Sequence, residues 1–522
     1  MNMKEEISNI SKTLKNSIVS VAAQIILLFL QFVNRRIFII FLDIEFLGYQ
    51  TLFSNVFTLL SVAELGIGNI ICYQLYKEVV SNNKDEIGRL MYLYKWLYRL
   101  VAVIVLIGGL ISSFFLPYIV TDARAGWDYL YLIYFLQLSS IILGYFLSYM
   151  RTIYTVTQQE YKCVKVDLFV SIAIQVLQIV LLVIFKNFII YFCLQLSTTI
   201  IANIAIAYKA KRKYPFIGKK YKLSKKYLKD RNLFSDIRNF LIHRISYAIW
   251  GGTDNIVISA MCGVRNVALY GNYTLIQSGV MNVFFNKLLN PIQATIGNIV
   301  YSERKKEDLW EQFEVLDVFS FFFASYIGVS FWIFYQPVIQ LWMGKEYLLS
   351  DTFVALYSIT VYLYAVFEIV YKYRTVFGNY RNDRNCMILS AFLNLVISII
   401  GAKIWGIPGI QFGTLISFLP IAYGRIRFVV SRYFEKSRWK YIFKHLLLLI
   451  LFIMESFICY ILCKKMPISI IGLVERGIVI LLVPSLINIT IHFRNKYFRQ
   501  MLNYLQRMID IVVGYKIKVK GN

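Results

Sequence analysis

Residues 17–42 read SIVSVAAQIILLFLQFVNRRIFIIFL, and their only ionisable side chains are those of Arg35 and Arg36. A bilayer core of about 30 Å needs roughly 20 apolar residues in helical form, so this run is long enough to cross a membrane. It is too long for the apolar part of a signal peptide, and no small-residue cleavage site follows it. The segment therefore predicts a first transmembrane helix that is kept in the protein.

The composition of the whole chain predicts the same environment. Of 522 residues, 58% are hydrophobic and only 16% are charged, whereas about a quarter of an ordinary soluble domain is charged. Apolar runs of membrane-spanning length recur along the chain, and we expect an all-α integral membrane protein with about 14 transmembrane helices. The predicted spans are 17–42, 50–76, 96–120, 128–150, 166–185, 187–208, 239–262, 267–300, 314–342, 353–371, 386–405, 407–424, 445–463 and 470–490.

The distribution of positive charge predicts the orientation of these spans. If the N-terminus is cytoplasmic, 44 of the 56 lysines and arginines fall in cytoplasmic segments or at the span ends beside them, eight fall in outer loops or at the span ends beside those, and the other four lie within spans. Cytoplasmic loops of membrane proteins carry such an excess, so we expect a multi-pass protein of the bacterial cytoplasmic membrane with both termini inside. The net charge of +27 then indicates contact with anionic lipids. Nucleic acid is not an expected partner, because the basic residues are spread over eight separate segments.

One cytoplasmic segment, 209–238, carries twelve lysines and arginines and divides the chain. We expect a six-helix half over 1–208, this basic linker, a second six-helix half over 239–430, and two extra helices with a basic tail over 431–522. A faint repeat with an offset of 220 residues agrees with two halves. The linker is interpreted as an ordinary membrane-surface segment, and a docking site for a partner enzyme is the alternative.

Several short runs resemble a known family. They include Phe46-Leu47-Gly48-Tyr49 and Ala63-Glu64-Leu65-Gly66-Ile67-Gly68 near the second span, and Thr253-Asp254-Asn255 with Leu269-Tyr270-Gly271-Asn272-Tyr273 in the second half. The chain resembles polysaccharide-export flippases of the multidrug/oligosaccharidyl-lipid/polysaccharide exporter superfamily. The resemblance implies two helical bundles in a V-shaped, alternating-access arrangement. It also implies a cargo of oligosaccharide linked to undecaprenyl diphosphate, moved outward for capsule, exopolysaccharide or O-antigen synthesis, with a polysaccharide polymerase or glycosyltransferases as further partners.

The four cations within the spans fit an anionic cargo, because a lipid diphosphate must cross a layer of low dielectric. Ionisable groups at membrane depth are costly and are therefore candidates for function. The four are Arg35, Arg36, Arg244 and Lys287, and we predict that they line a cavity and bind the diphosphate. For each of them, reaching the lipid headgroups is the alternative interpretation.

Two acidic residues within the spans are candidates for a gate or for ion coupling. Asp254 lies at a depth similar to that of Arg35 and Arg36, and one of these arginines is predicted to pair with it across an outer gate. Glu64 lies near the middle of the second span, before Gly66 and Gly68. Pairing with an arginine of the first span is the favoured interpretation for Glu64, and titration in ion coupling is the alternative.

An enzyme is not expected from this sequence. The outer loops hold no paired carboxylates or activated nucleophile, there is no P-loop, and the three histidines lie too far apart for a metal motif. No cofactor or metal is predicted. A flippase for lipid II or for a teichoic-acid precursor, a multidrug exporter of the same superfamily, and a non-transporting scaffold of a polysaccharide assembly complex remain alternatives.

Overall fold

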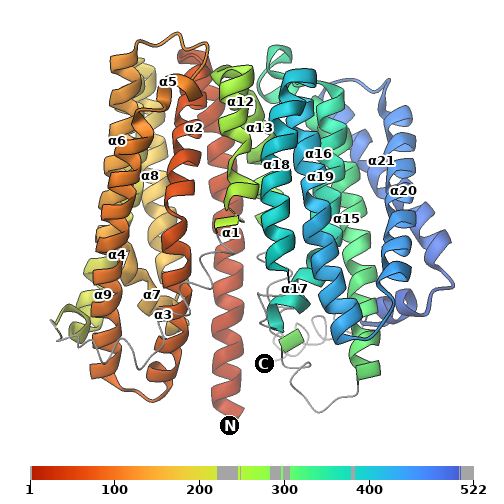
Figure 1. Ribbon diagram of the computed structural model, residues 1–522, viewed down its shortest axis with the longest axis horizontal. Coiled ribbons are helices and arrows are strands. Elements are labelled where there is room, and N and C mark those ends of the chain that lie inside the picture. The colour runs from red at the N-terminus through yellow and green to blue at the C-terminus, as the bar shows by residue number, and fades with distance from the viewer. Residues whose placement is uncertain are drawn as a thin grey trace, which may run out of the picture. The chain divides into compact units, whose positions relative to one another are not determined.

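The computed structural model describes residues 3–219, 221, 245–246, 248–282, 296–297, 306–377, 383–504 and 506. Every regular element in these ranges is a helix, as Figure 1 shows. This agrees with the behaviour of a chain in hydrocarbon, where backbone N–H and C=O groups find no water and must bond within the segment. The prediction of an all-α integral membrane protein is confirmed.

The chain packs as two compact units, of which the first comprises Met1–Val283 and Leu395–Ile410. Within it, α2 packs against α6 on one side and against α12 and α13 on another, while α1 packs along α8. Its principal helices are α1 (Met3–Phe41), α2 (Glu45–Leu60), α3 (Val62–Val80), α4 (Lys84–Ser113), α6 (Trp127–Ser148), α8 (Tyr161–Phe185), α9 (Phe188–Lys213), α12 (Asp254–Cys262) and α13 (Val264–Met281). Short segments α5 (Leu116–Ile119) and α7 (Thr152–Val156) join these helices.

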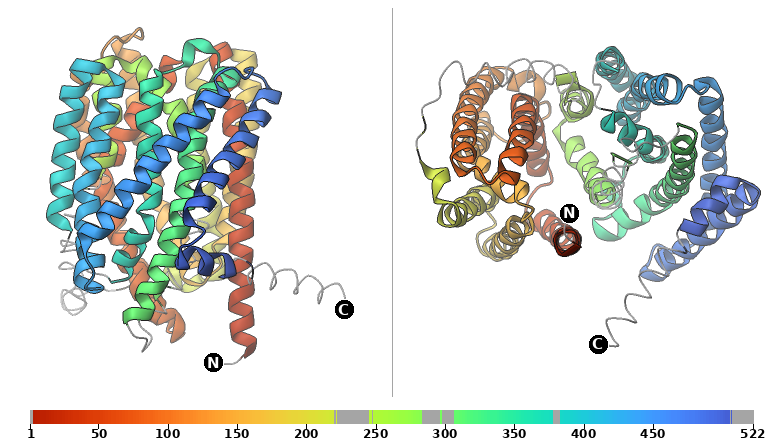
Figure 2. Two further views of the ribbon diagram at one scale, coloured as in Figure 1. Left: turned by 90° about the vertical axis from the view of Figure 1, so that its right-hand side faces the viewer. Right: turned by 90° about the horizontal axis from the view of Figure 1, so that it is seen from below.

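The second unit comprises Phe284–Asn394 and Gln411–Asn522. Within this unit α15 packs against α16, α20 and α21, which Figure 2 shows beside it. The helices are α15 (Lys306–Trp342), α16 (Asp351–Val366), α17 (Glu368–Val376), α18 (Arg384–Trp405), α19 (Ile407–Ile426), α20 (Arg438–Cys463) and α21 (Ile470–His492), with the middle of the α18–α19 pair belonging to the first unit. The predicted domain boundaries at 208, 238 and 430 rest on an internal sequence repeat rather than on the packing of helices, and they stay a prediction.

Eleven helices among the described residues are long and apolar enough to cross a membrane. They correspond to all the predicted spans except 50–76, 239–262 and 267–300. The first of these exceptions is divided into α2 and α3, and the other two run into residues outside the described ranges.

Ser61 divides the second predicted span. Its backbone (φ −80°, ψ 2°) leaves the helical conformation between α2 and α3, and its hydroxyl donates to the carbonyl oxygen of Phe57 at 2.7 Å. Thr58 makes the same kind of bond to the carbonyl of Ser54 at 2.8 Å. Such bonds to the preceding turn bend helices. The bend places Glu64 in the first turn of a new helix.

A cluster of buried charges joins α20 to α15 in the second unit. Asp317 of α15 is fully buried, and it accepts from Tyr441 at 2.5 Å and from Lys444 at 2.7 Å. Lys444 also donates to Glu314 at 2.7 Å, and the His445 ring lies 3.2 Å from Asp317. Because each partner satisfies a group that would otherwise be buried alone, the cluster fixes the register of the two helices.

A second polar contact joins three helices of this unit. Glu455 of α20 is buried and accepts a hydrogen bond from Ser325 of α15. Asn488 of α21 donates to the same serine at 3.5 Å. Polar side chains that bond across helices hold membrane bundles together, so Glu455 contributes to the docking of α20 and α21 on α15.

We expect Asp317→Asn to lower the free energy of unfolding by about 3 kcal/mol, because it removes one of the two carboxylates that pair with Lys444 in this buried cluster. The measurement is denaturation of the purified protein in mixed micelles. Glu311→Gln is the matched control, since Glu311 lies on the same helix but forms an exposed ion pair with Lys496, and exposed pairs contribute little. Equal losses in the two variants would contradict the role given to the cluster.

Candidate functional site

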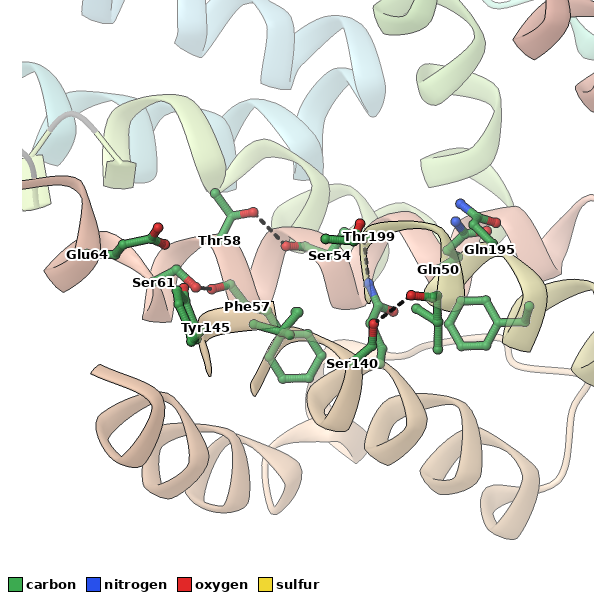
Figure 3. A pocket seen from close by; sticks show the side chains of 14 residues that line it. Gln50, Ser54, Phe57, Thr58, Ser61, Glu64, Ser140, Tyr145, Gln195 and Thr199 are labelled. Carbon is green, nitrogen blue, oxygen red and sulfur yellow. Dashed lines mark hydrogen bonds between the residues drawn. The ribbon is translucent and has the colours of Figure 1, made fainter. Parts of the chain in front are cut away.

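A cavity of about 500 Å³ lies within the first unit, a size typical of ligand pockets. Its walls are formed by α2, the start of α3, α6 and α9, and most of the lining side chains carry an amide, a hydroxyl or a carboxylate (Figure 3). We refer to it as the polar pocket. It is lined by Gln50, Ser54, Phe57, Thr58, Ser61, Glu64, Gln137, Ser140, Ile141, Tyr145, Phe192, Gln195, Leu196 and Thr199.

The lining residues recur at helical spacing, which places them on one face of each helix. On α2 and α3 the polar positions Gln50, Ser54, Ser61 and Glu64 follow this spacing. Figure 3 shows Glu64 at one end of the lining, with Gln50 and Gln195 at the other. The polar pocket is therefore an elongated feature that follows the axis of α2.

Glu64 is the one ionisable acid or base in the lining. The Tyr98 hydroxyl donates to its Oε1 at 2.8 Å, and Tyr94 donates to the Tyr98 oxygen at 2.9 Å. Within the described part of the chain, Glu64 forms no ion pair. The favoured interpretation, an ion pair with Arg35 or Arg36, is therefore not what the structure contains, because tyrosine hydroxyls provide the hydrogen bond instead.

Arg35 lies on α1 against α13, and it does not line the polar pocket. Its Nε donates to Asn272 Oδ1 at 2.6 Å, and its Nη2 donates to the carbonyl oxygen of Ala268 at 3.1 Å. A Cβ atom at Gly271 would lie 3.0 Å from the guanidinium, so the glycine leaves room for it. Arg36 is the next residue and is exposed, since adjacent residues on a helix point in different directions.

The other predicted site residues are distributed as follows. Asp254 is buried in the first turn of α12, where the positive end of a helix favours a carboxylate. Arg244 and Lys287 lie outside the described residues. Among residues that are described, no group of three His, Cys, Asp or Glu side chains could hold a metal ion.

Sequence analysis did not identify the neutral part of the site. Glutamine, serine and threonine residues inside apolar segments carry no charge, and a search for ionisable residues passes over them. The available signal was the spacing of the polar residues at 50, 54, 58, 61 and 64, which indicates a polar stripe on a helix otherwise suited to lipid.

No family model and no curated protein matches this chain. Its fold is similar to that of solved membrane transporters. The lipid II flippase MurJ in an inward closed conformation superposes with a TM-score of 0.66 at 14% sequence identity, over 93% of this chain and 99% of that one. An inward-facing multidrug resistance transporter of the MATE family, from the MOP superfamily, has a TM-score of 0.56 at 15% identity over 79% of this chain and 98% of its own.

A mutant of the Vibrio cholerae MATE transporter VcmN gives a TM-score of 0.51 at 14% identity, over 80% of this chain and 95% of its own. The chain has the fold of MOP-superfamily transporters. These similar structures are transporters rather than enzymes, and at this level of identity the likeness shows the fold alone.

If the polar pocket is open to water, a cysteine placed in its lining reacts with a membrane-impermeant methanethiosulfonate. We expect Thr58→Cys, in a variant without the seven native cysteines, to be labelled in intact cells or inverted vesicles. The control is Val180→Cys on α8, which is 46% exposed but does not line the pocket, and which we expect to face lipid. Labelling of Val180→Cys at the same rate would contradict an aqueous pocket.

Proposed function

We propose that the protein flips undecaprenyl-diphosphate-linked oligosaccharide across the bacterial cytoplasmic membrane by alternating access, in the synthesis of capsule, exopolysaccharide or O-antigen. The observation that carries the proposal is the polar pocket, two of whose wall helices, α6 and α9, are of membrane-spanning length. Polar groups at this depth are expensive unless they serve a ligand or water. A carrier for sugars needs amide and hydroxyl groups of this kind. The fold, which is similar to that of a lipid II flippase, supports the same class of cargo.

The polar pocket also bears on the alternatives. An exporter of cationic drugs needs acidic groups in an apolar, aromatic cavity, whereas Gln50, Gln137 and Gln195 place three amides around the single carboxylate of Glu64. The pocket therefore favours a sugar-bearing cargo over a cationic drug. Lipid II is the second candidate cargo, because it combines sugars with a diphosphate lipid and the MurJ fold is similar. A scaffold without transport would have no use for the pocket.

The basic residues are assigned to the charged part of the cargo. We propose that Arg35, Arg36, Arg244 and Lys287 bind the diphosphate during the cycle. Arginine suits this role through its planar fork of donors. The bonds from Arg35 to Asn272 and Ala268 hold its guanidinium in place. Glu64 and Asp254 are proposed to act in gating or ion coupling.

Leaflet exchange of a labelled lipid tests the function. We expect vesicles containing the wild-type protein to move undecaprenyl-diphosphate oligosaccharide between leaflets, and we expect Lys287→Ala to slow the exchange by about tenfold, the effect of losing one charge-assisted contact. Glu311→Gln, at the exposed pair with Lys496, serves as the control and should exchange at the wild-type rate. No exchange by the wild-type protein under any ion gradient would refute the proposal.

Charge reversal tests the predicted gate. We expect Arg36→Asp and Asp254→Arg each to reduce exchange at least tenfold, and the double variant to recover a large part of the activity, because the pair is restored with its polarity inverted. Arg35→Asp, alone and combined with Asp254→Arg, gives the comparison, because Arg35 already donates to Asn272 and Ala268. Equal loss in the single and double variants at both positions would remove the gate from the proposal.

A further inference from the structure

Three glutamines, one on each of three helices, line the polar pocket. Gln50 belongs to α2, Gln137 to α6 and Gln195 to α9. In each of them the side-chain oxygen Oε1 is buried and has no hydrogen-bond partner within the described part of the chain. Buried polar atoms in proteins are nearly always hydrogen-bonded, so three such acceptors in the walls of one cavity leave hydrogen-bonding capacity unused there.

The orientation of Gln137 is fixed by its neighbour. Its Nε2 donates to the Ser54 hydroxyl at 2.5 Å, which leaves Oε1 as the atom with unused capacity. The residue is only 5% exposed and belongs to the lining of the polar pocket. The Ser140 hydroxyl also has a partner, because it donates to the carbonyl oxygen of Leu196 at 3.1 Å. The buried side-chain atoms of the wall that have no partner among the described residues are therefore all acceptors.

The charge of the lining does not suit the diphosphate part of the proposed cargo. Among its described residues, Glu64 is the one Asp, Glu, Lys, Arg or His, and its carboxylate already accepts from Tyr98. A diphosphate offers only acceptors and negative charge at neutral pH. It would meet acceptors and a carboxylate there, in a medium where like charges repel strongly.

Sugar hydroxyls and acetamido N–H groups fit this lining. Both are donors without net charge, and the aromatic rings of Phe57, Tyr145 and Phe192 offer apolar surface for the C–H faces of sugar rings. Gln50 and Glu64 lie 14 residues apart along α2 and α3, which corresponds to about 21 Å at 1.5 Å per helical residue. The length of the lining suits a chain of sugars rather than one ring.

We propose that the polar pocket binds the uncharged sugar chain of the cargo through its hydroxyl and N–H donors, and that the diphosphate stays outside it. The inference rests on the proposed function, and it deepens that function by assigning the two chemical parts of the cargo to different places.

Binding measured with two lipids tests the inference. The probes are undecaprenyl diphosphate without sugar and undecaprenyl-diphosphate oligosaccharide extracted from the source cells, each titrated into the full-length protein in nanodiscs. We expect Gln137→Leu and Gln195→Leu each to weaken binding of the oligosaccharide lipid by about fivefold to tenfold, the range for one lost hydrogen bond. Binding of the sugar-free lipid should be unchanged.

Gln175→Leu is the matched control. Gln175 lies on α8 of the same unit, its Oε1 is also buried without a partner among the described atoms, and it does not line the polar pocket. We expect this variant to bind both lipids as the wild type does. Melting temperatures of all variants show whether the glutamine changes disturb the fold.

The outcomes separate the inference from the proposed function. Equal weakening for both lipids, or no weakening in either pocket variant, would overturn the sugar site. Leaflet exchange without any preference for the sugar-bearing lipid would also overturn it while leaving the flippase function intact. Glutamine-dependent binding of the oligosaccharide lipid without leaflet exchange would instead defeat the proposed function and leave the sugar site standing.

Discussion

The absence of water in the bilayer core is the constraint on which this structure depends. It forces the backbone into helices, because only there does each N–H find a C=O within its own segment. It also gives every polar side chain at membrane depth a cost, which another side chain, a ligand or water must offset. The way in which each polar group is satisfied therefore distinguishes the parts that hold the protein together from the parts that can bind something.

Two sets of polar groups, one in each unit, illustrate this difference. In the second unit, Asp317 has three partners from α20, and Glu455 has Ser325, so these groups act between helices and fix their packing. In the first unit, the buried amide oxygens of three residues that line the polar pocket, one each from α2, α6 and α9, have no described partner. Polar groups of the first kind stabilise a bundle, whereas groups of the second kind cost stability and are retained for binding.

The sequence predicts the helical framework well because apolar length and the position of charge are local properties. Fourteen apolar segments and the basic segments between them can be identified without knowing which helices meet. The polar pocket could not be predicted in this way, because Gln137 and Gln195 become neighbours of Ser54 only after α6 and α9 pack around α2. The partner of Arg35 could not be predicted either, because Asn272 lies 237 residues further along the chain. Glu64 was identified because it is charged, yet its tyrosine partner depends on the packing of α4 against α3.

The helix α2 connects the two kinds of chemistry proposed for the cargo. One side of it faces the polar pocket, and its first turn approaches α13 so closely that a Cβ atom at Gly48 would lie 2.4 Å from the carbonyl oxygen of Val264. Arg35 is held by that same α13, through Asn272 and Ala268. A guanidinium close to three unsatisfied amide oxygens would donate to them and leave no acceptor for sugar. The cation and the acceptors can therefore bind different parts of the cargo only when they lie apart. Separate places for the anionic and the neutral parts of one cargo therefore follow from hydrogen-bond chemistry as well as from charge.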